Sequence, residues 1–218
     1  YALLSCTHYQ ARFKDALETP GPRVPLTGNA ADWSEAVALG GRLIWLHTYA
    51  ERYVDASAGR PAGVVPSVPG LEWAKEPTSV PEKPSDITYT ASDQTLSVGD
   101  GRIVGVRPEV WSFSVSEMDV VKKWLGYRTT KGAGKAASST NPLDHMRISH
   151  WPKEWSEELL QLLNVLSLTL DLQPKLAALL DRICDGPLIS VSDIPKPTKA
   201  ERDDPVVKKN SGAQASLL

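Results

Sequence analysis

The sequence predicts an α+β fold, in which a small antiparallel β-sheet at about residues 86–116 is flanked by several α-helices. Two observations predict it. Short runs that alternate apolar and polar residues, separated by turn residues, occupy the middle of the chain. Longer apolar patterns with helical spacing stand on both sides of these runs. We expect residues 1–194 to form the folded domain and the polar residues 196–218 to form a disordered tail.

Two helices are predicted before the sheet. Apolar residues recur at a spacing of four between Thr7 and Leu17, which indicates a short helix. Asn29 followed by Asp32 is typical of a helix N-cap, and the apolar pattern then continues to about residue 56. Gly40-Gly41 lies inside this second helix, where each glycine costs about 1 kcal/mol relative to alanine. We therefore expect a close packing contact at the two glycines.

The middle of the chain is predicted to form a long loop followed by short strands. Residues 57–85 are rich in proline, glycine and serine and predict a long loop without regular structure. The strands that follow are separated by turns at residues 92–94 and 99–101. The last strand is expected over Val110 to Val115, because Trp111, Phe113 and Val115 alternate with serines. Together these runs predict an antiparallel meander.

A short helix and a polar loop are expected after the sheet. Ser116 with Asp119 gives a second N-cap pattern, which opens a helix through Leu125. Residues 128–143 are rich in lysine, glycine, serine and threonine, and this composition indicates a loop.

Two further helices are predicted near the end of the folded part. Pro152 stands at a typical first helical position and begins an amphipathic helix to about Leu170. Pro174 begins another, which Gly186 ends. We expect two separate helices here, because proline is unfavourable inside a helix.

Composition limits the class of protein. The 218 residues carry a net charge of −2, and 41% of them are hydrophobic, which suits a globular domain. No apolar run is long enough for a transmembrane helix. The chain lacks a starting Met and a secretion leader, so we expect a piece of a longer cytoplasmic protein. Cys6 and Cys184 are expected to be reduced core thiols.

The sequence contains no complete catalytic or metal-binding motif. Asn141-Pro142-Leu143-Asp144 has only a partial likeness to the signature of adenine methyltransferases, because it lacks the second proline and the aromatic residue. The four histidines have no metal-ligand spacing, and His47 is expected to be a core residue. We therefore predict no catalytic residue, no metal site and no cofactor in this chain.

Positive charge is concentrated in one segment. Between Lys122 and Arg147, six basic side chains stand against one acid, Asp144, for a local net charge of +5. Such a loop could neutralise DNA phosphates or could simply be solvated. Arg128 is the better candidate for reading a base, since a guanidinium can contact guanine O6 and N7 together. The candidate DNA contacts are Lys122, Lys123, Arg128, Thr129, Thr130, Lys131, Lys135, Ser138, Ser139 and Arg147.

Three segments carry a resemblance to a known family. Pro22-Arg23-Val24-Pro25-Leu26, followed by Gly40–His47, resembles a strand and helix of large single-chain restriction-modification enzymes. Val110–Phe113 with Met118–Arg128 is similar to a second segment of these enzymes, and Asp181–Ile189 to a third. The chain resembles the C-terminal target-recognition (specificity) domain of type ISP enzymes, which are related to single-chain type IIG enzymes.

The resemblance implies a function and partners. It implies sequence-specific recognition of double-stranded DNA within a polypeptide that also has nuclease, helicase-like ATPase and N6-adenine methyltransferase parts. S-adenosylmethionine, ATP and Mg²⁺ would belong to those parts, and the adjoining methyltransferase and helicase domains would be partners. Within the motifs, Arg23, His47 and Trp124 are expected to be structural.

Two alternatives remain open at this point. The chain could be a non-catalytic scaffold that docks the methyltransferase or helicase part through helices at about 154–185. A large exposed apolar patch on those helices would favour this alternative. It could also be a stand-alone enzyme, which a deep pocket with converging carboxylates or histidines would favour.

Overall fold

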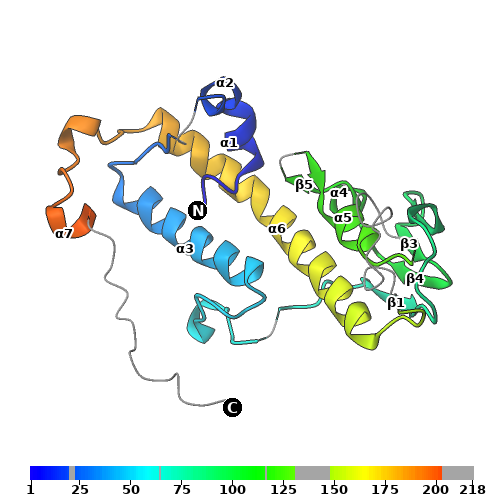
Figure 1. Cartoon of the computed structure of the whole chain (residues 1–218). Helices are drawn as coiled ribbons and strands as arrows, with labels where there is room; N and C mark the ends of the chain where they lie inside the picture. The colour runs from blue at the N-terminus through cyan, green and yellow to red at the C-terminus, as the bar shows by residue number, and fades with distance from the viewer. Residues whose placement is uncertain (20–22, 64, 116, 131–147, 203–218) are drawn as a thin grey trace, which may run out of the picture.

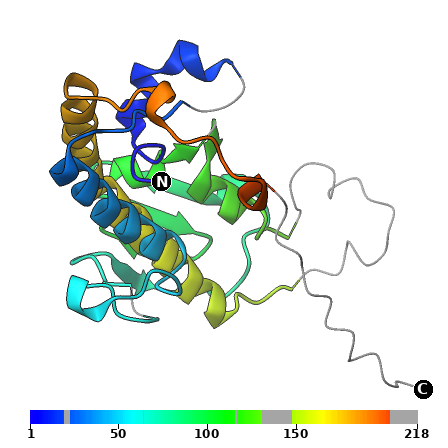
Figure 2. The same cartoon turned by 90° about the vertical axis from the view of Figure 1, so that its left-hand side faces the viewer.

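The computed structural model describes residues 1–19, 23–63, 65–115, 117–130 and 148–202. The fold is α+β, as predicted. Helix α6 (Lys153–Asp185) runs through the molecule, and the other elements pack along it (Figure 1). A four-stranded sheet lies beside its N-terminal half, while α3 (Ala30–His47) lies alongside its C-terminal half (Figures 1 and 2). In the described ranges, none of the helices combines the length and the apolar composition that crossing a bilayer requires.

The predicted N-terminal helix is divided in two. Its parts are α1 (Thr7–Arg12) and α2 (Lys14–Leu17), with Phe13 between them outside helical geometry. The predicted cap of α3 is confirmed, because Asn29 Oδ1 accepts hydrogen bonds from the backbone N–H groups of Ala31 and Asp32, at 2.9 and 3.3 Å. These bonds satisfy two amides that have no partner within the helix.

Helix α3 ends earlier than predicted, at His47 instead of about residue 56. Tyr49 and Ala50 both adopt positive φ angles, of 51° and 63°, which a right-handed helix cannot include. The Ala50 N–H bonds to Trp45 O at 2.8 Å, so the chain turns back against the end of the helix. The apolar pattern continued past this point because Ala50 is itself buried, in a turn.

The packing contact at Gly40-Gly41 is confirmed. A Cβ at Gly40 would stand 3.5 Å from the backbone nitrogen of Ala2, and one at Gly41 would stand 3.5 Å from the ring of Tyr53. Both glycines are buried. Gly40 thus lies against the N-terminal segment, and Gly41 lies against the segment that follows α3.

The main sheet has four strands, one of which the sequence did not predict. Its order is β1-β4-β3-β2 and all its pairs are antiparallel. Strand β1 falls inside the stretch 57–85 that we expected to be a loop. The other strands follow the predicted runs and turns. The strands are β1 (Glu72–Lys75), β2 (Ile87–Thr90), β3 (Thr95–Val98) and β4 (Gly101–Val104).

Strand β1 was missed because prolines surround it and its partner is distant in sequence. Trp73 pairs with Ile103, and a register shift follows between Trp73 and Lys75. Gly105 explains how the backbone after β4 can approach the backbone before β1 so closely. Its φ is 73°, and a Cβ there would lie 2.1 Å from the carbonyl oxygen of Gly70. Only glycine fits this position.

The prediction of a strand over Val110–Val115 is wrong. Helix α4 (Pro108–Trp111) occupies its first part, followed by a small hairpin of β5 (Ser114–Val115) and β6 (Met118–Asp119). Pro108 begins the helix because its fixed φ suits the first helical turn. Val110 is fully buried against the core, so the alternation that suggested a strand comes from a helix and a turn.

Helix α5 (Val120–Gly126) follows the hairpin directly. Asp119 is its N-cap residue but forms no side-chain capping bond. The predicted cap Ser116 lies outside the described residues.

The two helices predicted around Pro174 form one continuous helix, α6. An interior proline removes a hydrogen bond and costs about 3 kcal/mol, so contacts around it must compensate. Gln173 accepts a hydrogen bond from the Thr7 N–H at 2.9 Å and donates one to Ser5 O at 3.1 Å. Leu176 is fully buried one turn later. The N-terminal segment therefore holds α6 where proline would weaken it, and Gly186 is its C-cap, as predicted.

Helix α6 contributes to two main apolar cores. The first lies between the sheet, α4, α5 and the N-terminal half of α6, and includes Leu96, Ile103 and Leu159. The second lies between the N-terminal segment, α3 and the C-terminal half of α6, and includes Tyr9 and Leu179. Beyond α6, the tail that we expected to be disordered contains the short exposed helix α7 (Lys199–Arg202), and residues 203–218 lie outside the described ranges.

Candidate nucleic-acid interface

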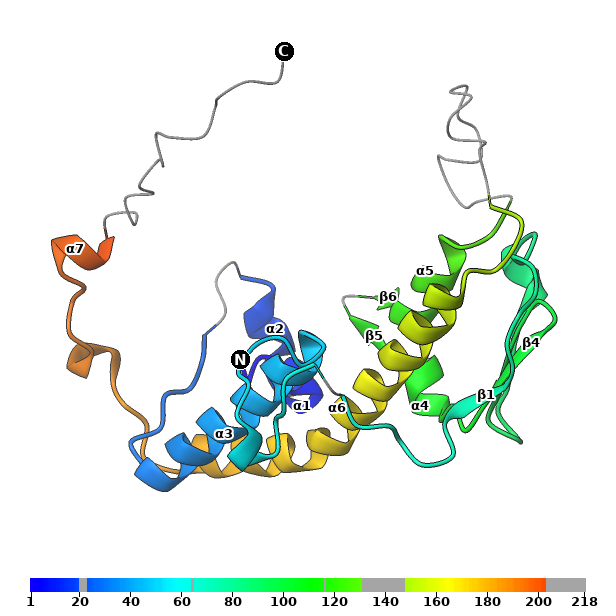
Figure 3. The same ribbon diagram turned by 90° about the horizontal axis from the view of Figure 1, so that it is seen from below.

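The first candidate site is formed by the β5–β6 hairpin and α5, the described residues 114, 115 and 117–127, here called the hairpin–α5 unit. Figure 3 shows both parts on the same side of the sheet-bearing end of α6. Val121 and Leu125 are buried in the sheet core and hold α5 in place. Lys122 and Lys123 are exposed. The unit therefore presents two cations to solvent from a fixed position.

Each of the two lysines has a local contact. The Lys122 ammonium lies 2.7 Å from a carboxylate oxygen of Asp119 and 5.4 Å from the ring centroid of Trp111. The Lys123 ammonium lies 5.0 Å from the ring centroid of Tyr127, whose side chain is 65% exposed. Exposed ion pairs and exposed cation–π contacts each contribute only about 1 kcal/mol or less, so both cations can exchange these contacts for a phosphate.

Arg128 differs from the lysines because the protein holds its side chain. The guanidinium carbon lies 3.5 Å from the ring centroid of Trp124 and 5.2 Å from that of Trp155. Its terminal nitrogens donate to Trp124 O at 3.2 Å and to Glu158 at 2.9 Å. Trp124 also packs on the sheet core, which confirms the structural role expected for it. This arrangement favours a positioning role for Arg128 over contact with a base.

The two threonines after Arg128 are also tied to the protein. Thr129 is buried, and its hydroxyl lies within 3.4 Å of Gly126 O as a donor. The Thr130 N–H donates to Pro81 O at 2.9 Å, and its hydroxyl donates to Glu82 O at 3.4 Å. The remaining candidate contacts, Lys131, Lys135, Ser138, Ser139 and Arg147, lie outside the described residues.

The residues before and after segment 131–147 bond the same stretch of the chain, residues 78–82. Residues 78–82 bond Thr130 on one side, as described above. On the other side, the Val80 N–H donates to Ser149 O at 3.0 Å, and Ser79 forms a β-bridge with His150. The described residues that flank segment 131–147 are thus both bonded to the same stretch, residues 78–82. The sequence did not predict these bonds, because residues 78–82 belong to the stretch that we expected to be an irregular loop.

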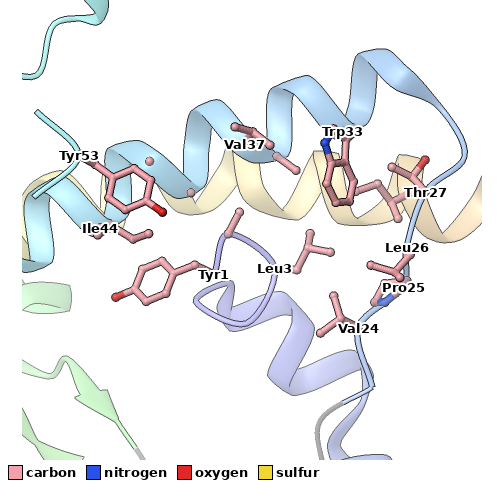
Figure 4. Close-up of a pocket in the computed structure, with 15 residues that line it drawn as sticks. Tyr1, Leu3, Val24, Pro25, Leu26, Thr27, Trp33, Val37, Ile44 and Tyr53 are labelled. Atoms are coloured by element: carbon pink, nitrogen blue, oxygen red, sulfur yellow. The ribbon is translucent and has the colours of Figure 1, made fainter. Parts of the chain in front are cut away.

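A second candidate site is an apolar groove of about 330 Å³ along α3, here called the α3 groove. Trp33, Val37 and Ile44 line it from α3, and Tyr1 and Tyr53 close one end (Figure 4). Trp33, Val37 and Tyr53 are more than half exposed. One feature of the sequence indicates this groove: the apolar residues of α3 lie on two sides of the helix, and only one of these sides faces α6.

Chemically, the α3 groove suits binding of an apolar surface. No carboxylate, histidine, lysine or arginine is among the described residues that line it. In the described part of the chain, His, Cys, Asp and Glu side chains nowhere gather in the groups of three or more that could hold a metal ion. The groove therefore offers none of the convergent acid–base groups that a stand-alone enzyme would need.

Comparison with protein families identifies the chain. Residues 1–162 match the family described as the type ISP C-terminal specificity domain. The chain belongs to this family. Comparison with curated proteins and with solved structures gave no match. Membership supports a role in target recognition within a restriction-modification enzyme, and the matched range includes the hairpin–α5 unit, the basic segment and the described α3 part of the groove.

Proposed function

We propose that this type ISP specificity domain recognises double-stranded DNA through the hairpin–α5 unit and the adjoining basic segment 131–147. The observation that carries the proposal is that α5 presents two exposed lysines and that the residues flanking segment 131–147 on both sides bond one stretch, residues 78–82. Lysines at this place would neutralise phosphates and release counterions. The surface would then hold the duplex while other groups read the bases.

The proposal assigns different roles to the candidate residues. Lys122, Lys123, Lys131, Lys135 and Arg147 would contact phosphates, and Ser138 and Ser139 would donate hydrogen bonds in the same segment. Arg128, Thr129 and Thr130 would position the start of the segment, because their side chains are already bonded within the protein. In the enzyme, the bound site would be presented to an N6-adenine methyltransferase part, with nuclease and helicase-like parts in the same polypeptide.

Salt dependence of binding tests the proposal. For four to six phosphate contacts, a plot of log affinity against log salt concentration should have a slope of roughly −4 to −5. Replacing both lysines (Lys122→Ala with Lys123→Ala) should reduce the size of the slope by about 2, since each phosphate contact contributes about 1. The measurement is fluorescence anisotropy with a short labelled duplex, between about 50 and about 300 mM salt.

A charge-matched variant provides the control. Lys196→Ala with Lys199→Ala removes two exposed cations near α7, which lies at the opposite end of α6 from the sheet (Figure 1). Its slope should equal that of the wild type. A folded wild-type chain that binds no duplex at low salt would refute the proposal, and an unchanged slope for the α5 variant would move the interface elsewhere.

The α3 groove favours a second role, docking on another part of the enzyme. The scaffold alternative placed a docking surface on the 154–185 helices, but α6 buries most of its apolar residues in the two main cores. The exposed apolar side chains of α3 provide such a surface instead. In the enzyme that contains this domain, Trp33→Ser with Val37→Ser should make the domain easier to release by limited proteolysis. The isolated chain should unfold at an unchanged temperature, and equal proteolysis of both enzymes would contradict docking here.

A further inference from the structure

The β5–β6 hairpin exposes a pair of apolar side chains. Val115 and Met118 stand opposite each other in the hairpin register, and they are 48% and 47% exposed. Glu117 has a φ of 64°, a conformation that turns the chain tightly beside this pair. Both apolar side chains therefore lie at the end of the hairpin, in contact with solvent.

The base of the hairpin is fixed to α5. The Val120 N–H donates to Phe113 O at 3.0 Å, and Ser114 pairs with Asp119. Asp119 in turn holds the Lys122 ammonium. The hairpin that carries the apolar pair is thus joined to α5, which carries the cations, and both elements lie on the same side of the sheet-bearing end of the molecule (Figure 3).

This combination matches the chemistry of the DNA major groove. The groove admits a two-stranded β-ribbon, and thymine is the base that presents a methyl group there. Apolar side chains read that methyl group by contact, while neighbouring lysines hold the phosphates. Glu117 cannot contact phosphates favourably, but a carboxylate can accept a hydrogen bond from cytosine N4.

We propose that Val115 and Met118 enter the major groove and read the methyl groups of thymine bases in the target. The inference rests on the proposed function and assigns the base-reading element that the phosphate contacts do not provide. The α3 groove is also apolar and exposed, but the described residues that line it include no cation that could hold a phosphate. The hairpin is therefore the better candidate for DNA.

Uracil-containing DNA tests the inference directly, because uracil differs from thymine only by the absent methyl group. A target duplex is first selected from a randomised pool with the wild-type chain. It is then synthesised with deoxyuridine at each thymine in turn. At the contacted positions the wild type should bind about fourfold more weakly for each methyl group lost, as expected for burial of one such group.

The variant Val115→Ala with Met118→Ala should bind the thymine and uracil duplexes equally. Its salt slope should equal that of the wild type, because the lysines are unchanged. Val191→Ala with Ile194→Ala removes apolar side chains of similar size that are exposed between α6 and α7, and it should keep the preference for thymine. Circular dichroism and thermal unfolding show whether each variant folds.

Three results would overturn the inference: a wild type indifferent to thymine methyl groups, a hairpin variant that keeps the preference, or a wild-type dimer that the hairpin variant dissociates in sedimentation. Failure of the proposed function looks different, because the wild type would then bind no duplex at any salt concentration. Salt-dependent binding without a methyl preference would refute only the hairpin contact.

Discussion

At the scale of single residues, His47 joins three parts of the helical core. Its Nδ1 lies 2.7 Å from the Tyr1 hydroxyl, and its Nε2 lies 3.0 Å from the hydroxyl of the buried Thr169. Desolvation by burial lowers the pKa of the imidazole below its ordinary value. The neutral ring therefore connects the N-terminal segment, α3 and α6, and the structural role expected for His47 is confirmed.

This environment predicts a dependence of stability on pH. Because the pKa is lower in the folded state, the unfolded chain binds the proton first as pH falls. The contribution of His47 is therefore complete above about pH 6.5 and is lost below it. His47→Gln should show a smaller loss of unfolding free energy than the wild type between about pH 7.5 and about pH 5.5, measured by urea denaturation. His8 is unchanged in both proteins, and parallel pH profiles would contradict the prediction.

At the scale of elements, two prolines have opposite consequences. Pro108 begins helix α4 where alternation predicted a strand, and Pro174 lies inside α6 where sequence rules predicted a helix start. In the first case the local preference of proline prevails, because Val110 can be buried from a helical turn. In the second case contacts with Ser5 and Thr7 offset the local cost.

The cap of α3 gives a prediction at the same scale. Asn29→Ala removes an acceptor for two amides and should lower the free energy of unfolding by about 1 kcal/mol. Ser34→Ala is the control, since Ser34 lies exposed within α3 and its hydroxyl only bonds back to Ala30 O. That control should change stability by less than about 0.5 kcal/mol. Equal effects of the two substitutions in chemical denaturation would show that the cap contributes nothing particular.

At the scale of the whole molecule, α6 connects the two main cores. Its 33 residues span about 50 Å at the rise of an α-helix. Leu159 and Leu163 belong to the sheet core, while Leu176 and Leu179 belong to the helical core. Arg107 adds a contact near the middle, donating to Asp171 at 2.8 Å and to Ser167 O. The continuous helix therefore couples the sheet-bearing part, where we propose that DNA binds, to the part that contains the α3 groove.

This coupling predicts a single unfolding transition. Leu159→Ala and Leu179→Ala each leave a cavity in a different core, and each should destabilise the protein by about 2–5 kcal/mol. Both substitutions should shift the same transition, whether tryptophan fluorescence or circular dichroism reports it. Two transitions, each sensitive to only one substitution, would mean that the cores unfold separately.

The sequence by itself determined the features that depend on neighbouring residues and on family patterns. The α+β class, the Asn29 cap, the turns of the β2–β3–β4 meander, the close contact at Gly40-Gly41 and the type ISP family all followed from it. Each of these is encoded within a few residues or in ordered motifs.

Only the tertiary structure decided the features whose partners are distant along the chain. Strand β1 depends on β4, and Pro174 is tolerated because the first residues of the chain bond to α6. For Arg128, only the structure shows that Trp155 and Glu158 of α6 contact its guanidinium group. The residues that flank the basic segment are brought to one place because Thr130 and Ser149 bond the same stretch, residues 78–82. Local preferences are too weak to fix such contacts, which depend on how the helices and the sheet pack together.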